Sequence, residues 1–370
     1  MLIRIVRVGK CNVSSGENGI RRPTMKKYLS LLVSFLMVLT CYVTCVANEI
    51  TENDIETKTY GSIKVEEYKD EANRIIRRYK NEGGLIKSDG DINFDSIKSL
   101  LFSFGLDEKN VSKLRRDDLL AIAKGKEIIA VTSYIKTDKD GNVTYVTEAE
   151  AMNAALIAKE QQNTLIHNIE SGLQNREGYY DELQDSYMQV VYTITNYGGG
   201  EYLHSIDARW LIMPYYRSMD SLGACATETA LIDNTQYGYY YYDAYIYSGL
   251  TGSNSVVFNY INNNYGNPIN GNWYGSAGYF DLPDDIYETG YTAIYDDFRA
   301  HFQFRGSVVN PTLQTVYNAV GSYTHTRISV SFSPSITITF PGTLSASAGI
   351  NVFWADPEIR GIPITVHYYP

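Results

Sequence analysis

Tyrosine is the residue type that this sequence concentrates most unusually, in the run GYYYYDAYIYSG at 238–249. In an extended strand, side chains alternate between two faces, so one face of this run carries Tyr239, Tyr241, Tyr245 and Tyr247. Only one face of a half-solvated sheet packs on a core, and we therefore expect these rings to be exposed. Flat apolar rings with hydroxyls suit sugar or protein ligands, so they are the predicted ligand-binding residues. The alternative is cross-strand aromatic packing without a ligand.

Three histidines are predicted to lie on polar strand faces, at His301, His325 and His367. If their strands were neighbours, the imidazoles would converge as zinc ligands. Flanking arginines repel a cation, so we predict surface histidines, no metal site and no cofactor. His204 lies on an apolar strand face and is predicted to be a hydrogen-bonded core residue.

Carboxylates offer two further candidates. One loop concentrates the hard oxygen ligands that Ca²⁺ prefers, although an acidic surface turn is the commoner arrangement. Its members are Asp281, Asp284, Asp285 and Glu288. Asp296 and Asp297 are adjacent, so on a regular strand they point to opposite faces and make a poor general acid–base pair.

No motif for a serine nucleophile, a zinc protease or a phosphate-binding loop occurs in the chain. Whether the protein is an enzyme is therefore left open, with a non-catalytic protein preferred. The segment 48–370 carries 41 acidic and 25 basic residues, a net charge of −16. So acidic a surface repels nucleic acid and anionic lipid headgroups. We predict no nucleic-acid partner.

The start of the chain has the pattern of an export signal. Lys26 and Lys27 precede an apolar run, and small residues end at Ala47, which predicts a signal peptide over 25–47 and a mature start at Asn48. The alternative is an uncleaved anchor over 28–46, which is long enough to span a bilayer and would be the only membrane contact. Residues 1–24 fit neither signal nor domain and are predicted to be a non-native extension, with Met25 as the true start. The mature chain would keep only Cys225, so no disulfide framework is expected.

The next segments are predicted to be mainly helical. Residues 48–62 are polar and acidic and predict a flexible lead-in. Over 63–183 we expect an α+β region, with helices at 63–81, 95–104, 112–124 and 148–173 and one hairpin in 127–147. The helix at 63–81 is predicted because apolar residues recur there at three- and four-residue steps. This apolar stripe consists of Val65, Tyr68, Ala72, Ile75 and Tyr79.

The remainder, 184–370, holds 24 of the 33 tyrosines and no lysine. It reads as many short alternating strands separated by Gly, Asn and Pro, beginning with a hairpin that turns at Gly198–Gly200. This pattern favours an antiparallel β-sandwich. The predicted fold class is thus α+β, with a mainly helical N-terminal region followed by a tyrosine-rich sandwich.

The general pattern resembles exported proteins of Gram-positive bacteria, and no motif identifies a family. The leading hypothesis is a non-catalytic protein, secreted or associated with the cell surface, whose β-region binds a glycan or cell-surface protein. One alternative is a secreted, glycosidase-like hydrolase with dispersed carboxylates. A minor alternative is a pore-forming protein, because 324–340 alternates Ser and Thr with apolar residues as a membrane strand does.

Overall fold

The computed structural model describes residues 55–70, 72–138, 141–171, 185–214, 217, 219–226, 229–232, 234–248, 254–262, 269–272, 275–288, 291–308, 316–326, 336–339, 347–350 and 357–367. Within these ranges, no helix has both the length and the apolar character to cross a membrane.

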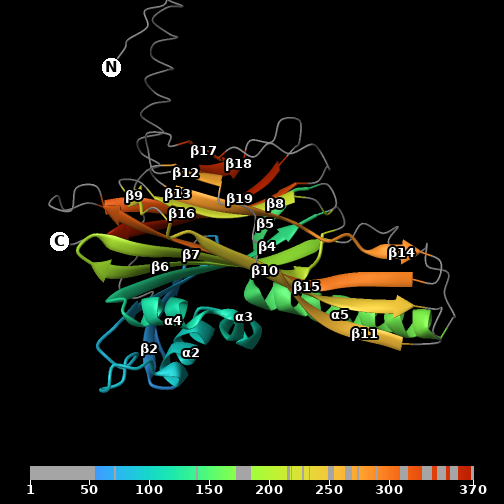
Figure 1. Ribbon diagram of the computed structural model, residues 1–370, viewed down its shortest axis with the longest axis horizontal. Coiled ribbons are helices and arrows are strands. Elements are labelled where there is room, and N and C mark those ends of the chain that lie inside the picture. The colour runs from blue at the N-terminus through green and yellow to red at the C-terminus, as the bar shows by residue number, and fades with distance from the viewer. Residues whose placement is uncertain are drawn as a thin grey trace, which may run out of the picture. The chain divides into compact units, whose positions relative to one another are not determined.

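The larger of two sheets has twelve strands, and every pairing in it is antiparallel (Figure 1). Nine strands follow the order β1-β2-β3-β4-β6-β7-β15-β10-β11, while β5 pairs with β4, and β9 and β14 pair with β15. The bounds are β1 Glu56–Tyr60, β2 Ile63–Lys69, β3 Ile75–Lys80, β4 Glu127–Thr137, β5 Val143–Val146, β6 Ser186–Gly198, β7 Glu201–Ile212, β9 Thr229–Leu231, β10 Tyr237–Ser248, β11 Asn254–Asn262, β14 Ile286–Glu288 and β15 Tyr291–Val308.

The smaller sheet has five antiparallel strands in the order β12-β13-β8-β16-β19. A separate pair is formed by β17 and β18. The bounds are β8 Met219–Ala226, β12 Ile269–Asn272, β13 Gly275–Asp281, β16 Val316–Thr326, β17 Ile336–Thr339, β18 Ser347–Ile350 and β19 Pro357–His367.

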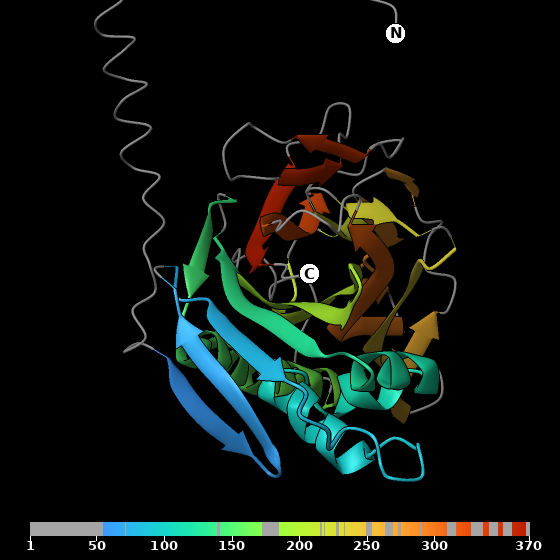
Figure 2. The same cartoon turned by 90° about the vertical axis from the view of Figure 1, so that its left-hand side faces the viewer.

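Four described helices lie on the face of the larger sheet that is turned away from the smaller sheet (Figure 2). They are α2 Phe94–Ser103, α3 Glu108–Lys113, α4 Arg116–Ala123 and α5 Glu148–Glu170. Side-chain caps fix where several of them begin: Asn93, Asp107 and Thr147 each accept a backbone N–H from the first turn of α2, α3 and α5. The result is three layers, in the order small sheet, large sheet, helices.

The main core fills the space between the two sheets. Strands of the large sheet contribute Tyr192, Trp210 and Phe302, and strands of the small sheet contribute Leu222 and Tyr323, all at 1% exposure or less. A second core lies between α2, α4 and the strands β2, β3, β4 and β6. Alternate side chains of the central strands therefore enter different layers, and both faces of the large sheet are covered.

The prediction of a mainly helical N-terminal region was wrong, because 63–80 forms the hairpin β2–β3. Its residues alternate between buried and more exposed positions, with Ile63 and Val65 buried on one strand and Ile75 and Tyr79 on the next. The reversal comes at Asp70–Asn73, where the Asp70 carboxylate accepts two backbone N–H groups and Asn73 takes φ +59°. Asn tolerates this left-handed conformation, and the helical stripe spans the turn by coincidence.

Several local predictions were confirmed. The expected hairpins appear as β4–β5 and β6–β7, and the expected long helix appears as α5. The segment predicted as the lead-in contains β1, and β4 pairs with β6 along eleven residues. The two expected regions on either side of residue 184 therefore share one sheet. The sandwich predicted for 184–370 exists as packed sheets, but the large sheet recruits strands from residue 56 onward.

Candidate functional site

The structure buries three of the four tyrosines that were predicted to be exposed. Tyr239, Tyr241 and Tyr245 are 4%, 2% and 7% exposed. Helices cover this face of β10: the ammonium of Lys113 in α3 lies 5.8 Å from the Tyr241 ring centre, and Tyr245 packs in a cluster with α5. The predicted exposure was therefore wrong for these three rings. The side chain of Tyr247 lies outside the described residues.

The opposite face of β10 packs into the core between the sheets. Tyr240 and Tyr242 stack on Phe298 with ring centres 5.5 and 6.2 Å apart, so the aromatic-packing alternative accounts for both. The alternation of residues within β10 does not reveal that helices from other parts of the chain will cover the outer face of that strand. A ligand-binding role for the four predicted tyrosines stays a prediction.

The histidines considered as zinc ligands are not brought together. His301 of β15 is buried beneath the helices, and its Nδ1 donates to Asp207 over 2.9 Å. His325 of β16 is buried in the other sheet, where its Nδ1 donates to Asp220 over 2.8 Å. The prediction that both are surface residues was wrong, and the His367 side chain lies outside the described residues. In the ranges described, no group of His, Cys, Asp or Glu is placed to hold a metal ion.

His204 is a hydrogen-bonded core residue, as predicted. It is 1% exposed, its Nδ1 is hydrogen-bonded to the Tyr192 hydroxyl over 2.8 Å, and its ring stacks on Phe304 at 5.0 Å. Burial lowers the pKa of His204 to about 3, so the imidazole is neutral at physiological pH.

In the acidic loop that was considered as a calcium site, one carboxylate is already bound by other groups of the protein. Asp285 accepts two hydrogen bonds from the Arg217 guanidinium, at 2.6 and 3.0 Å, and one from the backbone N–H of Tyr295. A carboxylate that an arginine already neutralises is a poor Ca²⁺ ligand. The side chain of Glu288 lies outside the described residues.

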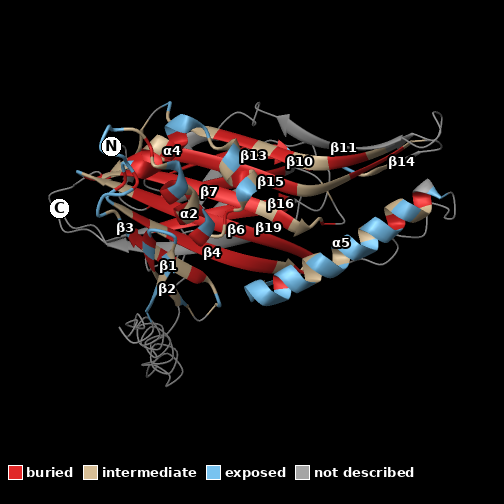
Figure 3. Ribbon diagram, turned by 90° about the horizontal axis from the view of Figure 1, so that it is seen from below, coloured by how far each residue is buried: buried red, intermediate tan, exposed pale blue. Residues whose placement is uncertain are grey.

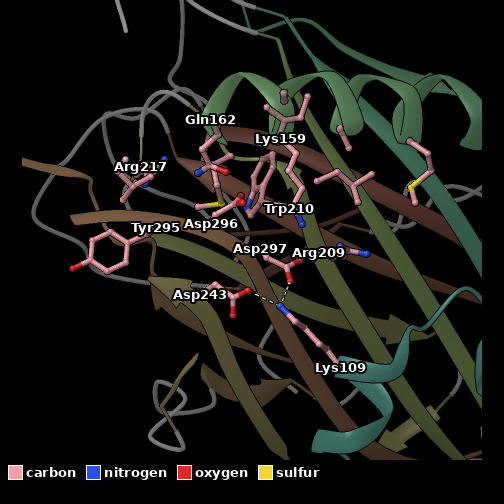
Figure 4. Close-up of a pocket in the computed structure, with 17 residues that line it drawn as sticks. Lys109, Lys159, Gln162, Arg209, Trp210, Arg217, Asp243, Tyr295, Asp296 and Asp297 are labelled. Atoms are coloured by element: carbon pink, nitrogen blue, oxygen red, sulfur yellow. Dashed lines mark hydrogen bonds and ion pairs between the residues drawn. The ribbon is translucent and has the colours of Figure 1, made fainter. Parts of the chain in front are cut away.

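A cavity of about 210 Å³ lies between α5 and the strands β7, β10 and β15, and we call it the α5 cavity (Figure 4). It is lined by Lys109, Met152, Ala155, Ala158, Lys159, Gln162, Arg209, Trp210, Leu211, Ile212, Met213, Arg217, Asp243, Ile294, Tyr295, Asp296 and Asp297. Sequence reasoning missed this site because its members come from distant segments. Figure 4 shows Lys159 and Gln162 projecting from α5 toward Trp210 and Asp296.

The helix α5 roofs this cavity because it is anchored near both ends. Near its start, Ala151 packs in a cluster with Tyr134 and Tyr187, and near its end Leu165 and Ile169 pack in another. Between these anchors the helix turns small alanines toward the sheet, which leaves space. Its outer side is largely exposed (Figure 3).

A β-bulge places two adjacent carboxylates on the helix side of β15. Tyr241 pairs with Arg299, but Asp243 pairs with Asp296, so two residues of β15 face one residue of β10. Asp297 takes φ +49° at this point, and both Asp296 and Asp297 line the α5 cavity. The prediction that they point to opposite faces was wrong. Periodicity gives no sign of a bulge.

Four charged residues next to α3 line the cavity, Lys109, Arg209, Asp243 and Asp297. Together with Asp107 and Arg299 behind them they form what we call the charge cluster. Lys109 donates to Asp243 and Asp297 at 2.5 and 2.6 Å, and Arg209 donates to Asp297 at 2.9 Å. Arg299 is 1% exposed and pairs with Asp107 and Asp297. Burial favours protonation of Asp297, but Arg209, Arg299 and Lys109 together hold its pKa below the ordinary value.

Asp296 has the opposite environment. Burial is the largest influence on its carboxyl and raises its pKa, and the charge of Asp297 acts in the same direction. A hydrogen bond from the Asp297 backbone N–H and the charges of Arg217 and Lys159 oppose this rise only in part. Among the described residues, no lysine or arginine forms an ion pair with Asp296, and none of their carboxylates pairs with Lys159. The α5 cavity thus combines a charge cluster whose members are paired with one another and two groups of opposite sign, Asp296 and Lys159, that form no ion pair among the described residues.

Such an arrangement favours binding over catalysis. A general base must be free to accept a proton, whereas Asp297 is held ionised by three cations. Among the described carboxylates that line the cavity, Asp296 is then the one that forms no ion pair with a lysine or arginine. Tyr295 also lines the cavity, and its ring packs edge-on against Tyr242 at 5.3 Å.

Comparisons with known proteins identify no family. No protein-family model matches the chain, and no curated protein matches it. Among solved structures, Clostridium perfringens delta-toxin is similar at 8% sequence identity and a TM-score of 0.20 over 85% of this chain and 96% of that one. Likeness of this degree does not indicate a shared fold or function.

Proposed function

We propose that the chain is an exported, non-catalytic binding protein that holds one residue of a glycan or protein ligand in the α5 cavity. The observation that carries the proposal is Asp296, a carboxyl without an ion-pair partner among the described residues, on the wall of a cavity with a half-apolar lining. Cavities with a few convergent polar groups and a titratable residue of perturbed pKa are the usual form of a binding site. The volume is below the ~300–1,000 Å³ of sites for drug-sized ligands, which suits one residue of a larger ligand.

Export is supported by the leader sequence alone. The basic pair at Lys26–Lys27, the apolar run and the small residues that end at Ala47 have the order of a cleavable signal. A glycan or cell-surface protein is the kind of ligand that an exported protein meets.

The test compares binding by the wild type with two variants that add the same ring to α5. Ala158→Phe fills the α5 cavity, whereas Asn153→Phe adds its ring on the exposed side of the helix. On glycan and cell-surface-protein arrays, we expect the wild type and Asn153→Phe to bind the same ligand. Ala158→Phe should bind it at least about tenfold more weakly, which corresponds to ~1.4 kcal/mol. Melting temperatures report whether each variant folds.

Two results would overturn this proposal. One is a wild type that binds nothing on either array. The other is a folded Ala158→Phe variant that binds as tightly as the wild type, which would place the site elsewhere.

A secreted hydrolase is the second candidate, and one observation favours it. The bulge brings Asp296 and Asp297 to the same face, and their pKa values move in opposite directions, as in acid–base pairs. The charge cluster on Asp297 argues against it. Release of reducing sugar from a bacterial or animal glycan, lost in Asp296→Ala, would favour the hydrolase over the binding protein.

The pore-forming alternative also stays a prediction. Most of the segment that suggested it, 327–335, lies outside the described residues, while 324–326 belongs to β16 and 336–339 is β17. Dye release from liposomes by the purified protein would favour this alternative, and intact liposomes would count against it.

A further inference from the structure

We infer that the residue held in the α5 cavity is a neutral sugar that presents neighbouring hydroxyl groups to Asp296, Gln162 and Lys159. The inference rests on the proposed function and names the chemistry of its ligand. Three properties of the cavity support it: its charge balance, its hydrogen-bonding groups and its apolar wall.

Charge balance disfavours ionic ligands. A cation placed beside Asp296 would also meet Lys159 and Arg217, whose charges already act on that carboxyl. An anion placed beside Lys159 would meet Asp296 and the nearby Asp297. Each kind of ion gains one attraction and meets at least one repulsion. A neutral ligand meets neither repulsion and leaves the charge cluster undisturbed.

Hydroxyl groups match the polar groups that are available. The carboxylate of Asp296 accepts hydrogen bonds, the ammonium of Lys159 donates them, and the amide of Gln162 does both. A hydroxyl donates and accepts, so two or three neighbouring hydroxyls can satisfy all three side chains without carrying charge. Lys159 and Gln162 lie on one side of the same helix, three residues apart, and Figure 4 shows them on the side of α5 that faces Asp296.

The remaining wall is apolar. Ala155 and Ala158 of α5, Ile212 at the end of β7 and Met213 just after it line the cavity. A sugar ring has C–H groups that lie against such a surface while its hydroxyls point the other way. An elongated apolar ligand would displace water from the carboxylate of Asp296 and offer it no hydrogen bond in return, which carries a cost in free energy.

The experiment uses three sugars of one shape and different charge: glucose, glucuronate and glucosamine. Binding to the wild-type protein is measured by saturation-transfer NMR and by titration, with N-acetylglucosamine, galactose and mannose as further neutral probes. We expect at least one neutral sugar to bind and the charged analogues to bind at least about fivefold more weakly. Asp296→Ala and Gln162→Ala should each weaken binding about tenfold, as expected when a polar partner in a binding pocket is lost. Asn153→Ala, on the exposed side of α5, should bind as the wild type does.

The outcomes separate this inference from the proposed function. Tighter binding of glucuronate or glucosamine than of every neutral sugar would overturn the neutral-sugar inference. So would neutral-sugar binding that is unchanged in folded Asp296→Ala. If no sugar binds but a protein on the array binds and is lost in Ala158→Phe, the inference fails and the proposed function stands. If Ala158→Phe loses nothing that the wild type binds, both fail.

Discussion

At the scale of single residues, the described chain assigns contrasting environments to carboxyl groups that are neighbours in sequence. Asp297 lies within ion-pair distance of Lys109, Arg209 and Arg299, while Asp296 has no such partner in the described ranges. The dipeptide in the sequence does not reveal this difference. It arises because a bulge turns both side chains to one face, where cations from β7 and α3 reach only one of them.

The raised pKa of Asp296 predicts that its charge lowers stability at neutral pH. A carboxyl whose folded pKa is raised contributes stability at pH values below its unfolded pKa, and this contribution is lost as the pH rises through the folded pKa. Asp296→Asn removes the buried charge, so we expect a higher melting temperature at pH 7 and no difference near pH 3. A lower melting temperature at pH 7 would show that the carboxylate is stabilised in the native protein.

Arg299 is predicted to be the most costly member of the charge cluster to replace. Arg299→Met keeps the length of the side chain but removes the more buried of the two arginines that bridge Asp107 and Asp297, the other being Arg209. We expect a loss of about 3 kcal/mol in the free energy of unfolding, at the lower end for a broken buried pair because Asp107 is 37% exposed. Urea denaturation measures it. Arg209→Met, whose side chain is 26% exposed, is the matched control and should lose less.

At the scale of elements, the helices are held to the large sheet in two ways. The helix α2 packs through apolar residues such as Ile97, Leu100 and Phe104. The α3–α4 segment combines apolar packing with the charge cluster and with Asp118, which accepts a hydrogen bond from Gln303 of β15 over 2.7 Å. Acid should therefore affect these helices differently, because it neutralises carboxylates and leaves apolar contacts intact.

We predict that α3 and α4 lose protection from hydrogen exchange before α2 as the solution becomes acidic. The pKa values of Asp107, Asp118 and Asp297 are held low. Their stabilising contribution is present above the ordinary carboxyl value of about 3.9 and is lost as the pH falls through the lowered values. Exchange measured by mass spectrometry at pH 7 and near pH 2.5, corrected for intrinsic rates, tests this. Equal loss across α2, α3 and α4 would contradict it.

Some secondary-structure elements could be predicted from the sequence alone, and others could not. Hairpins with glycine-containing turns and the capped helix α5 could be predicted, because their signals are local. The strands at 63–80 could not, since Val65, Ile75 and Tyr79 fit both a helical stripe and an alternating strand, and only the turn at Asn73 separates the two. The α5 cavity depends on contacts between α5 and β15, which are more than 100 residues apart and leave no local pattern.

At the scale of the whole molecule, two sheets approach closely because small residues face the inter-sheet core. A Cβ on Gly321 of β16 would lie 2.8 Å from the ring of Tyr192 and 3.0 Å from Ile206, both on the large sheet. Glycine is thus required here for the approach of one sheet to another, and not for an unusual φ.

Gly321→Ala is therefore expected to lower the free energy of unfolding by about 1–3 kcal/mol, the usual cost of overpacking a core. Chemical denaturation with tryptophan fluorescence measures the change, because Trp210 lies in the same core. The double variant Gly321→Ala with Ile206→Val should recover part of the loss. A Gly321→Ala protein as stable as the wild type would show that the sheets can separate slightly at no cost.

The leader makes a prediction about the mature protein. If the signal is cleaved after Ala47, the exported chain begins at Asn48, eight residues before β1. N-terminal sequencing of the protein released by an expressing bacterial cell checks this directly. A chain that keeps residues 28–46 and sediments with membranes would support the anchor instead.

The bulge in β15 has a consequence for how this protein can vary. The extra residue shifts the alternation of the strand, so Ile294 and Arg299 both face the helices, although side chains five positions apart in a regular strand point to opposite faces. Deleting one residue of the bulge would restore a regular ladder. Either Asp296 or Asp297 would then be the deleted residue, or one of the two would turn away from the wall of the cavity. The acidity of that wall is thus a property of strand length, and insertions or deletions would alter it more than most substitutions would.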